Sequence, residues 1–268
     1  MKKYYDISVK GNTLHVAAEV HEGGDVLLLL IHGLGCSSES FRSIRDYPFF
    51  ERCTVVAPDL AGFGSTAFSE GFSCSLEDHA LVCRELISLF RFRSLHVVGH
   101  SMGGAIGVLL CTMMGGRTSS FVNVEGNLVA ADCGISRRTM SMPHEAFREM
   151  LLLEIRLMAD AAGEPGVRMW ASMVEQSSPE AFNRSAASLV KWSDSGALLA
   201  DFLALQCPRV YVYGEKNAGI KALSGIGSIP SYAVPGSGHF PMNDNPGDFY
   251  RFLNEWLTRQ GVQLSRPL

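Results

Sequence analysis

A serine between glycines is the residue of this chain best suited to nucleophilic chemistry. Ser101 lies at the centre of the run GHSMG, residues 99–103. The apolar run LHVV, residues 95–98, precedes GHSMG, and the apolar, glycine-containing run MGGAIGVLLCTMM begins at Met102. This pattern is typical of a buried strand that turns directly into a helix. Such a tight turn lifts the serine hydroxyl out of the sheet and requires small neighbours. The alternative, an ordinary glycine–serine turn, is disfavoured by this context.

A histidine far along the chain is the candidate base for this serine, whose hydroxyl is a poor nucleophile until its proton is removed. Of the eight histidines, only His239 lies on a glycine-rich loop (PGSGHFP) after a late apolar run. We therefore predict that His239 is the general base. His32 and His100 flank glycines of the site and are interpreted as architectural. The others are assigned to the core or the surface: His15, His21, His79, His96 and His144.

Two backbone amides are predicted to stabilise an oxyanion. The run IHGLG, residues 31–35, follows the first long apolar run and can bring a backbone N–H to the same site. An oxyanion hole commonly combines an amide of such a loop with the amide of the residue after the nucleophile. We assign the amides of Leu34 and Met102. An ordinary glycine-rich turn is the competing interpretation of residues 31–35.

The elements that must position these residues follow a strand-then-helix rhythm. A loosely alternating hairpin is predicted at residues 4–19, and the segments 76–90, 102–114 and 248–258 have helical spacing. Apolar runs rich in Val, Leu and Ile, some nearly continuous, predict the strands of a mostly parallel sheet. These runs are residues 26–31, 53–57, 95–98, 121–124, 209–213 and 231–234.

One long segment departs from this rhythm. Residues 127–206 are rich in Met, Ala and Leu at helical spacing and contain no convincing strand pattern. We therefore predict an α/β core made of residues 1–126 and 207–268, interrupted by a helical cap sub-domain, residues 127–206. One or two cap side chains are expected to face a substrate pocket, from the set Met140, Met142, Met150, Met158, Met169, Met173, Trp170 and Trp192.

Composition limits the classes of function and location. With 47% hydrophobic and 19% charged residues the chain is not a disordered one, and a net charge of -4 favours a small-molecule substrate over nucleic acid. The longest apolar run is too short to cross a bilayer, and MKKYYDISVKG lacks the apolar region of a signal peptide. Seven cysteines without a CxxC pair favour a reduced, cytoplasmic setting. The oligomeric state stays open, a homo-oligomer included.

Four segments, taken in order, resemble those of the α/β-hydrolase fold superfamily over almost the whole chain. They are HGLG, PDLAGFGST, GHSMGG and GSGHFPMNDNP. The resemblance implies an eight-stranded, mainly parallel sheet with helices on both faces and a helical cap inserted after the sixth strand. It also implies a Ser–acid–His triad in that chain order. These motifs are specific for the fold and much less specific for the substrate.

The acid of the triad is where the sequence departs from that family. Asn217 stands where the family most often has an aspartate, and an amide there would favour the wrong imidazole tautomer. Glu125 is the preferred acid, because it ends the strand expected beside the nucleophile strand, and neighbouring strands are only about 4.8 Å apart. Glu215 is the alternative acid, and a chain without a competent acid is the third possibility. Asp244 is expected to cap the turn that follows His239.

The function predicted from these residues is that of a serine hydrolase cleaving a carboxylic ester, or a related acyl bond, of a small to medium, partly apolar substrate. The same triad serves C–C bond cleavage, amide hydrolysis, a lyase reaction or perhydrolysis, and a weakly catalytic ligand-binding protein is the remaining alternative. No metal is expected, because no His, Cys, Asp or Glu cluster has ligand spacing. No cofactor is expected either: the GFGSTA run does not lead directly from a strand into a helix.

Overall fold

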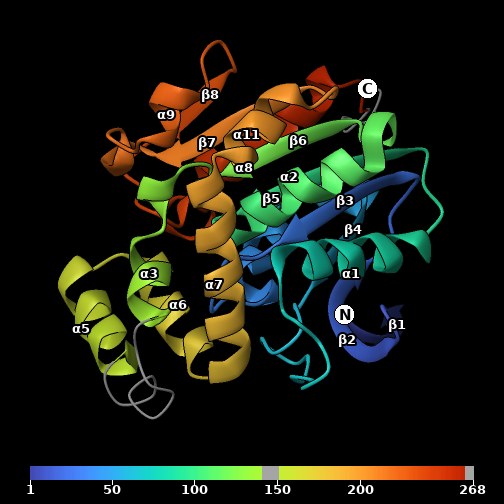
Figure 1. The fold of residues 1–268 in the computed structure, drawn as a ribbon. Helices are drawn as coiled ribbons and strands as arrows, with labels where there is room; N and C mark the ends of the chain where they lie inside the picture. The colour runs from blue at the N-terminus through green and yellow to red at the C-terminus, as the bar shows by residue number, and fades with distance from the viewer. Residues whose placement is uncertain (141–150, 263–268) are drawn as a thin grey trace.

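An eight-stranded sheet forms the centre of the protein (Figure 1). This computed structural model describes residues 1–140 and 151–262. The strand order is β1-β2-β4-β3-β5-β6-β7-β8, with β1 and β2 antiparallel and the other strands, apart from the β2–β4 pair, parallel. The predicted mostly parallel α/β sheet is therefore confirmed. The strands are β1 (Lys2–Val9), β2 (Asn12–His21), β3 (Val26–Ile31), β4 (Thr54–Pro58), β5 (Ser94–His100), β6 (Ser120–Val124), β7 (Arg209–Gly214) and β8 (Ser231–Val234).

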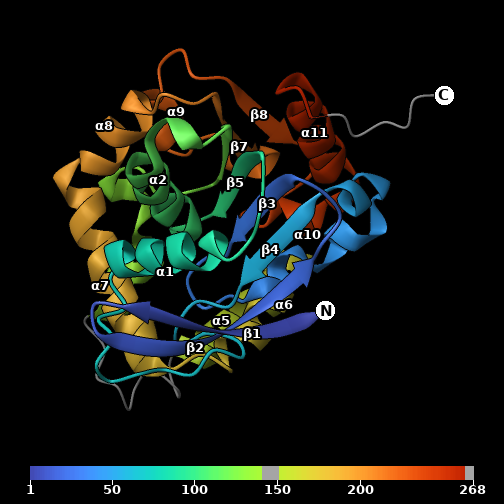
Figure 2. The same cartoon turned by 90° about the vertical axis from the view of Figure 1, so that its right-hand side faces the viewer.

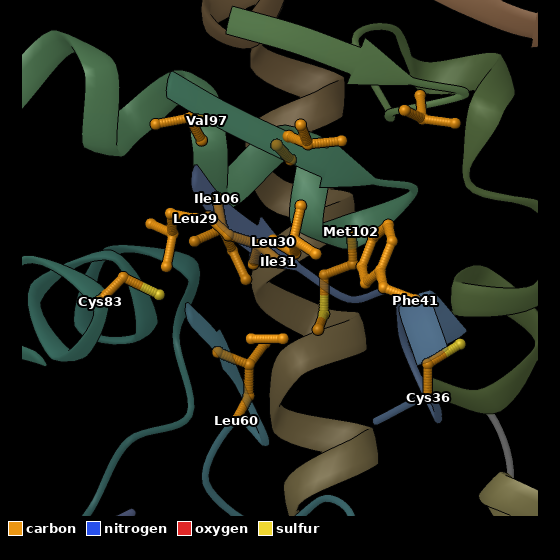
Figure 3. Close-up of a cluster of buried hydrophobic side chains, with 14 of the residues drawn as sticks. Leu29, Leu30, Ile31, Cys36, Phe41, Leu60, Cys83, Val97, Met102 and Ile106 are labelled. Atoms are coloured by element: carbon orange, nitrogen blue, oxygen red, sulfur yellow. The ribbon is translucent and has the colours of Figure 1, made fainter. Parts of the chain in front are cut away.

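The near-continuous apolar runs became strands because both faces of the sheet are covered. All six residues of β3 are buried, as are all five of β6. Figure 2 shows α1 (Leu76–Ser88) and α2 (Met102–Met114) on one side of the strands and α11 (Pro246–Arg259) on the other. In the core, Leu29, Leu30 and Ile31 of β3 lie beside Met102 and Ile106 of α2 (Figure 3).

The register of the parallel strands brings their carboxyl ends to one edge of the sheet. Ile31 of β3 pairs with Gly99 of β5, and Gly99 pairs with Asn123 of β6. On the other side, Val124 of β6 pairs with Val212 of β7, and β7 pairs with β8. The loops that follow β3, β5, β6, β7 and β8 therefore meet at this edge, where ligand sites collect in open α/β sheets.

Helices connect β6 to β7, and the described residues between these strands contain no strand. We call α3, α5, α6 and α7 the inserted helices, and Figure 1 shows them grouped at one side of the molecule. The helix that follows them, α8, instead packs against α2, so the expected cap range 127–206 includes one helix that lies on the core. The bounds are α3 (Gly134–Met140), α5 (Leu152–Ala162), α6 (Pro165–Val174), α7 (Pro179–Ser195) and α8 (Ala197–Ala204).

Local sequence sets the ends of the inserted helices. The Ser178 hydroxyl accepts a hydrogen bond from the amide of Ala181, and Pro179 opens α7, as expected for a helix start. Gly196 ends α7 in a left-handed conformation with φ 73°. Residues 163–164 separate α5 from α6, and residues 175–178 separate α6 from α7.

Short helices complete the described structure. They are η1 (Ser38–Asp46), η2 (Pro48–Arg52), η3 (Gly115–Arg117), η4 (Ala130–Asp132), η6 (Glu215–Asn217), α9 (Ala222–Gly225) and α10 (Pro241–Asp244). Of the helices formed by residues 1–140 and 151–262, none is at once long and apolar enough for a membrane span.

Candidate active site

Ser101 lies on a strained turn between β5 and α2. Its backbone has φ 52° and ψ -121°, a region that residues with a side chain rarely occupy and that costs about 1–3 kcal/mol. Glycine at position 103 allows the start of α2 to lie close to β3, because a Cβ atom there would be only 2.2 Å from the carbonyl oxygen of Ile31. The Ser101 amide donates to the carbonyl of Val124 at 2.9 Å, which ties the turn to the end of β6.

Glu125 is the carboxylate that contacts His239. Its Oε2 lies 2.7 Å from Nδ1 of His239, and the Glu125 side chain is only 1% exposed. Like Ser101 it has a positive φ, 45°, and its amide donates to the carbonyl of Val212 on β7 at 2.8 Å. Its Oε1 also accepts a hydrogen bond from the amide of Gly214 at 2.8 Å. The strained turn therefore fixes the carboxylate between β6 and β7.

This contact determines what the imidazole can do. When the Nδ1–H of a neutral His239 donates to Glu125, Nε2 carries no proton and can accept one. The His239 side chain is 40% exposed, so it remains open to a substrate. A second histidine holds its loop: Nε2 of His100 lies 2.8 Å from the backbone oxygen of His239. Burial holds the pKa of His100 well below its usual value, so His100 is neutral and its Nε2–H donates.

Ser101 and His239 face one cavity of about 330 Å³. Its wall combines the sheet edge with the inserted helices, and apolar side chains make up most of it. Of the methionines and tryptophans considered from the sequence, Met158 and Trp170 line it, whereas Met142 and Met150 lie outside the described residues. The lining residues are Gly33, Leu34, Cys36, His100, Ser101, Asn127, Asp132, Gly134, Ile135, Ser136, Met158, Val167, Trp170, Leu189, His239 and Phe240.

Comparison with known proteins identifies the family. The alpha/beta hydrolase family model matches residues 28–252. This chain belongs to the alpha/beta hydrolase family. It is 23% identical, over 97% of each chain, to the 2-hydroxy-6-oxo-6-(2'-aminophenyl)hexa-2,4-dienoic acid hydrolase of Metapseudomonas resinovorans.

Solved structures share the fold of this alpha/beta hydrolase. A thermophilic esterase from Thermogutta terrifontis has a TM-score of 0.77 at 20% identity, over 98% of this chain and 100% of the esterase. A variant of the N-acyl homoserine lactonase AidH has a TM-score of 0.75 at 18% identity, over 100% of both chains. At these identities the likeness establishes the fold alone.

Asn217 stands where the family most often has an aspartate, and the structure shows what its side chain contacts in this alpha/beta hydrolase. Its Nδ2 lies 2.9 Å from both carboxylate oxygens of Glu125. The amide at the usual acid position thus donates to a carboxylate supplied by the neighbouring strand end. Two carboxylates at this spacing would repel each other. An acid at residue 125 together with an amide at residue 217 is the signal that could have indicated this contact.

The other acidic candidates hold loops. Oε2 of Glu215 accepts a hydrogen bond from the amide of Gly236 at 2.9 Å. Asp244 does not cap the turn after His239 as expected. It is the last residue of α10, and each of its carboxylate oxygens accepts a hydrogen bond from a backbone amide of another segment. Oδ2 accepts from Gly238 at 2.9 Å and Oδ1 from Gly166 at 2.8 Å, so Asp244 joins the His239 loop to α6.

The two residues whose amides are assigned to the oxyanion adjoin Ser101 in the chain or line the same cavity. Met102 is the first residue of α2, where amides have no partner within the helix and the helix dipole favours negative charge. Leu34 lines the cavity, and a Cβ atom on the preceding Gly33 would be 3.0 Å from Cβ of Ser101. Nε1 of Trp170 donates to the carbonyl of Leu34 at 2.9 Å, a contact between α6 and this loop that the sequence did not indicate.

The remaining histidines of the core are held by local contacts. Nε2 of His32 accepts from the amide of Leu60 at 2.9 Å, which ties the loop after β3 to the loop after β4. Burial lowers the pKa of His32, so it stays neutral.

Among the described residues, no group of three His, Cys, Asp or Glu side chains could hold a metal ion. The expectation of no metal and no cofactor stays a prediction.

Proposed function

We propose that this alpha/beta hydrolase is a serine hydrolase that cleaves the carboxylic ester of a small to medium, partly apolar substrate through an acyl-enzyme. The observation that carries the proposal is the 2.7 Å contact between Glu125 and Nδ1 of His239, together with the cavity that His239 shares with Ser101. Nucleophile, base and orienting carboxylate are the parts that such chemistry needs. The apolar wall of the cavity supports a partly apolar substrate.

The mechanism assigns one role to each residue. The Ser101 oxygen attacks the ester carbonyl as its proton passes to Nε2 of His239, and the amides of Leu34 and Met102 hold the oxyanion. The intermediate collapses, and the departing alkoxide takes the proton from His239. Water then attacks the acyl-enzyme, giving its proton to His239, and the acid leaves as Ser101 regains its proton. Glu125 orients the imidazole and stabilises the imidazolium formed in each half.

Removal of the nucleophile tests this proposal. A fluorophosphonate probe should label Ser101, and Ser101→Ala should prevent labelling and lower the turnover of 4-nitrophenyl butanoate by at least about 10⁴-fold. Ser88→Ala is the matched control, because Ser88 is an exposed residue at the end of α1. Turnover by Ser101→Ala equal to that of the control would refute the mechanism.

A second candidate is C–C bond cleavage, which the same triad serves. The similarity to the dienoic acid hydrolase, over 97% of both chains, favours it. A 2-hydroxy-6-oxo-hexa-2,4-dienoic acid substrate measured beside phenyl and alkyl esters distinguishes the two. The alternative of a weakly catalytic binding protein depended on the amide of Asn217 at the usual acid position. Asn217 contacts the Glu125 carboxylate, which also contacts His239 and can serve as the acid, so this alternative is not favoured.

Cell location and the cap sub-domain remain proposals. The seven thiols are all free and buried, which supports a reducing compartment such as the cytoplasm. The inserted helices line the cavity over the sheet edge, which supports their role as a cap. We propose neither a nucleic acid nor a membrane as partner, and the oligomeric state stays open.

A further inference from the structure

The cavity beside Ser101 has an apolar side and a polar side. The apolar side comes from the loop after β3, from α6 and α7, and from Phe240. The polar side comes from a short segment after β6, where Asn127, Asp132 and Ser136 line the cavity. Apart from the two imidazoles and the Cys36 thiol, whose pKa burial raises to about 12, Asp132 is the one ionisable side chain among the described residues of the wall, and none of them is Lys or Arg.

Asp132 is held in place by the backbone on both sides. Its Oδ2 accepts hydrogen bonds from the amides of Leu128 at 2.9 Å and Val129 at 3.0 Å. Nδ2 of Asn127 donates to the Asp132 carbonyl at 2.6 Å. No described residue donates a hydrogen bond to Oδ1. One oxygen of a fixed carboxylate is therefore left for a donor on a ligand.

Burial raises the pKa of Asp132, and the nearby Glu125 carboxylate acts in the same direction. The two amides at Oδ2 oppose this by stabilising the charged form. Asp132 and His239 are also shared with a second, more polar hollow on the outer side, which Lys216 and Lys221 line. Nζ of Lys216 lies 2.7 Å from Glu164, so one of these two cations is already paired.

We propose that Asp132 is a specificity residue that makes the site accept neutral or cationic substrates with an N–H or O–H donor and reject substrates with a carboxylate. This rests on the proposed ester hydrolysis. A second negative charge brought into the cavity meets the half-buried Asp132 carboxylate beside mostly apolar side chains, with no described lysine or arginine on the wall of this cavity to offset it. A donor on the substrate instead gains a charge-assisted hydrogen bond to Oδ1.

A matched pair of substrates tests the charge preference. Phenyl hydrogen adipate carries a carboxylate at the end of its acyl chain, and its carboxamide analogue has nearly the same shape without the charge. A second pair has the same two groups on the alcohol side of a butanoate ester. We expect kcat/KM for the carboxamide to exceed that for the carboxylate by about tenfold or more in at least one pair, and the ratio to fall with added salt. Equal values in both pairs, or a preference for the carboxylate, would overturn the proposal.

Charge removal at residue 132 tests the assignment to this side chain. Asp132→Asn keeps an oxygen for the two amides and should bring the ratio to within about threefold, through a higher kcat/KM for the carboxylate ester. Asp6→Asn removes the same charge at β1, on the edge of the sheet, and should keep the wild-type ratio. Far-ultraviolet circular dichroism and thermal melting check that both variants fold.

The outcomes separate this proposal from the proposed function. If neutral 4-nitrophenyl butanoate is not hydrolysed, or if Ser101→Ala retains turnover, the proposed function fails. If the neutral ester is hydrolysed through Ser101 and folded Asp132→Asn keeps the wild-type ratio, only the role of Asp132 fails. Ser136→Ala is a second comparison on the polar side, and it should alter the ratio less than Asp132→Asn because it removes no charge.

Discussion

The two walls of the cavity beside Ser101 are built by different kinds of contact. On the sheet side, Ser101 lines the cavity and Glu125 contacts His239 from behind it; both occupy strained turns, and their amides donate to the neighbouring strand ends at Val124 and Val212. On the helical side, apolar side chains of the inserted helices lie over the sheet edge, and single hydrogen bonds such as Trp170 to Leu34 join the two. The first wall holds its reacting groups by short hydrogen bonds, whereas the second sets the shape of the cavity.

In the mechanism that we propose, this difference separates two tasks of the site. Proton transfer needs the hydrogen-bond geometry that a sheet register provides, and strain persists where surrounding contacts determine the backbone. Selection of a substrate needs a surface whose size and charge can change without moving the reacting groups. We therefore expect substitutions on the sheet wall to affect turnover most, and those on the helical wall to affect substrate preference or do less.

The largest effect is expected when the orienting carboxylate is replaced. Glu125→Gln should lower kcat for a neutral phenyl ester by about 10³- to 10⁴-fold, because an amide at this position favours the wrong tautomer of His239. Glu215→Gln is the matched control, since its carboxylate contacts Gly236, and should retain most of the activity. A loss of less than tenfold in Glu125→Gln would contradict the assignment of the acid.

The same substitution allows the carboxylate to be moved. Asn217→Asp in the Glu125→Gln background places the acid at the position usual for the family, next to the original one. We expect at least about tenfold recovery of kcat, because Asn217 lies 2.9 Å from the oxygen that contacts His239. Asn217→Ala in that background should show none. If both double variants behave alike, residue 217 contributes no more than space.

Sequence and structure agree most closely on the sheet wall, for a physical reason. Buried strands need apolar runs and the turn at Ser101 needs glycines, so both are encoded within a few neighbouring residues. The placement of Glu125 followed from its position at a strand end. The contact of Trp170 with Leu34 joins residues 136 positions apart, and no local pattern encodes it. The hairpin predicted at residues 4–19 turns at Lys10 and Gly11, with β2 beginning at Asn12.

A smaller effect is expected at the hydrogen bond between the two walls. Trp170→Phe keeps an aromatic ring in the cavity and removes the donor to the Leu34 carbonyl. We expect kcat to fall by about 3- to 30-fold with little change in KM, because the loop that carries the Leu34 amide loses a fixed partner. Trp192→Phe is the control, since Trp192 on α7 does not line the cavity. A change confined to KM would assign Trp170 to substrate packing alone.

The last effect concerns stability rather than turnover, at the junction of the core with the inserted helices. His79 on α1 lies 3.2 Å from the Ser185 hydroxyl on α7, and burial lowers the pKa of His79 from 6.5 to about 3. Between these two pH values the unfolded chain binds more protons at His79 than the folded chain does. The contribution of His79 to the free energy of unfolding is therefore fully present above pH 6.5 and is lost as the pH decreases through this window. From pH 7.5 to pH 5 this histidine should account for about 2 kcal/mol of lost stability.

Urea unfolding at these two pH values measures that loss. His79→Gln keeps a neutral hydrogen-bonding side chain that does not titrate, so the decrease between pH 7.5 and pH 5 should be smaller than in the wild type. Part of it should remain, because burial also lowers the pKa of His96, to about 4. His15→Gln, at an exposed position on β2, should leave the decrease due to buried histidines in place. An undiminished pH dependence in His79→Gln would mean that this junction opens before His79 takes up a proton, which would make the helical wall the less stable of the two.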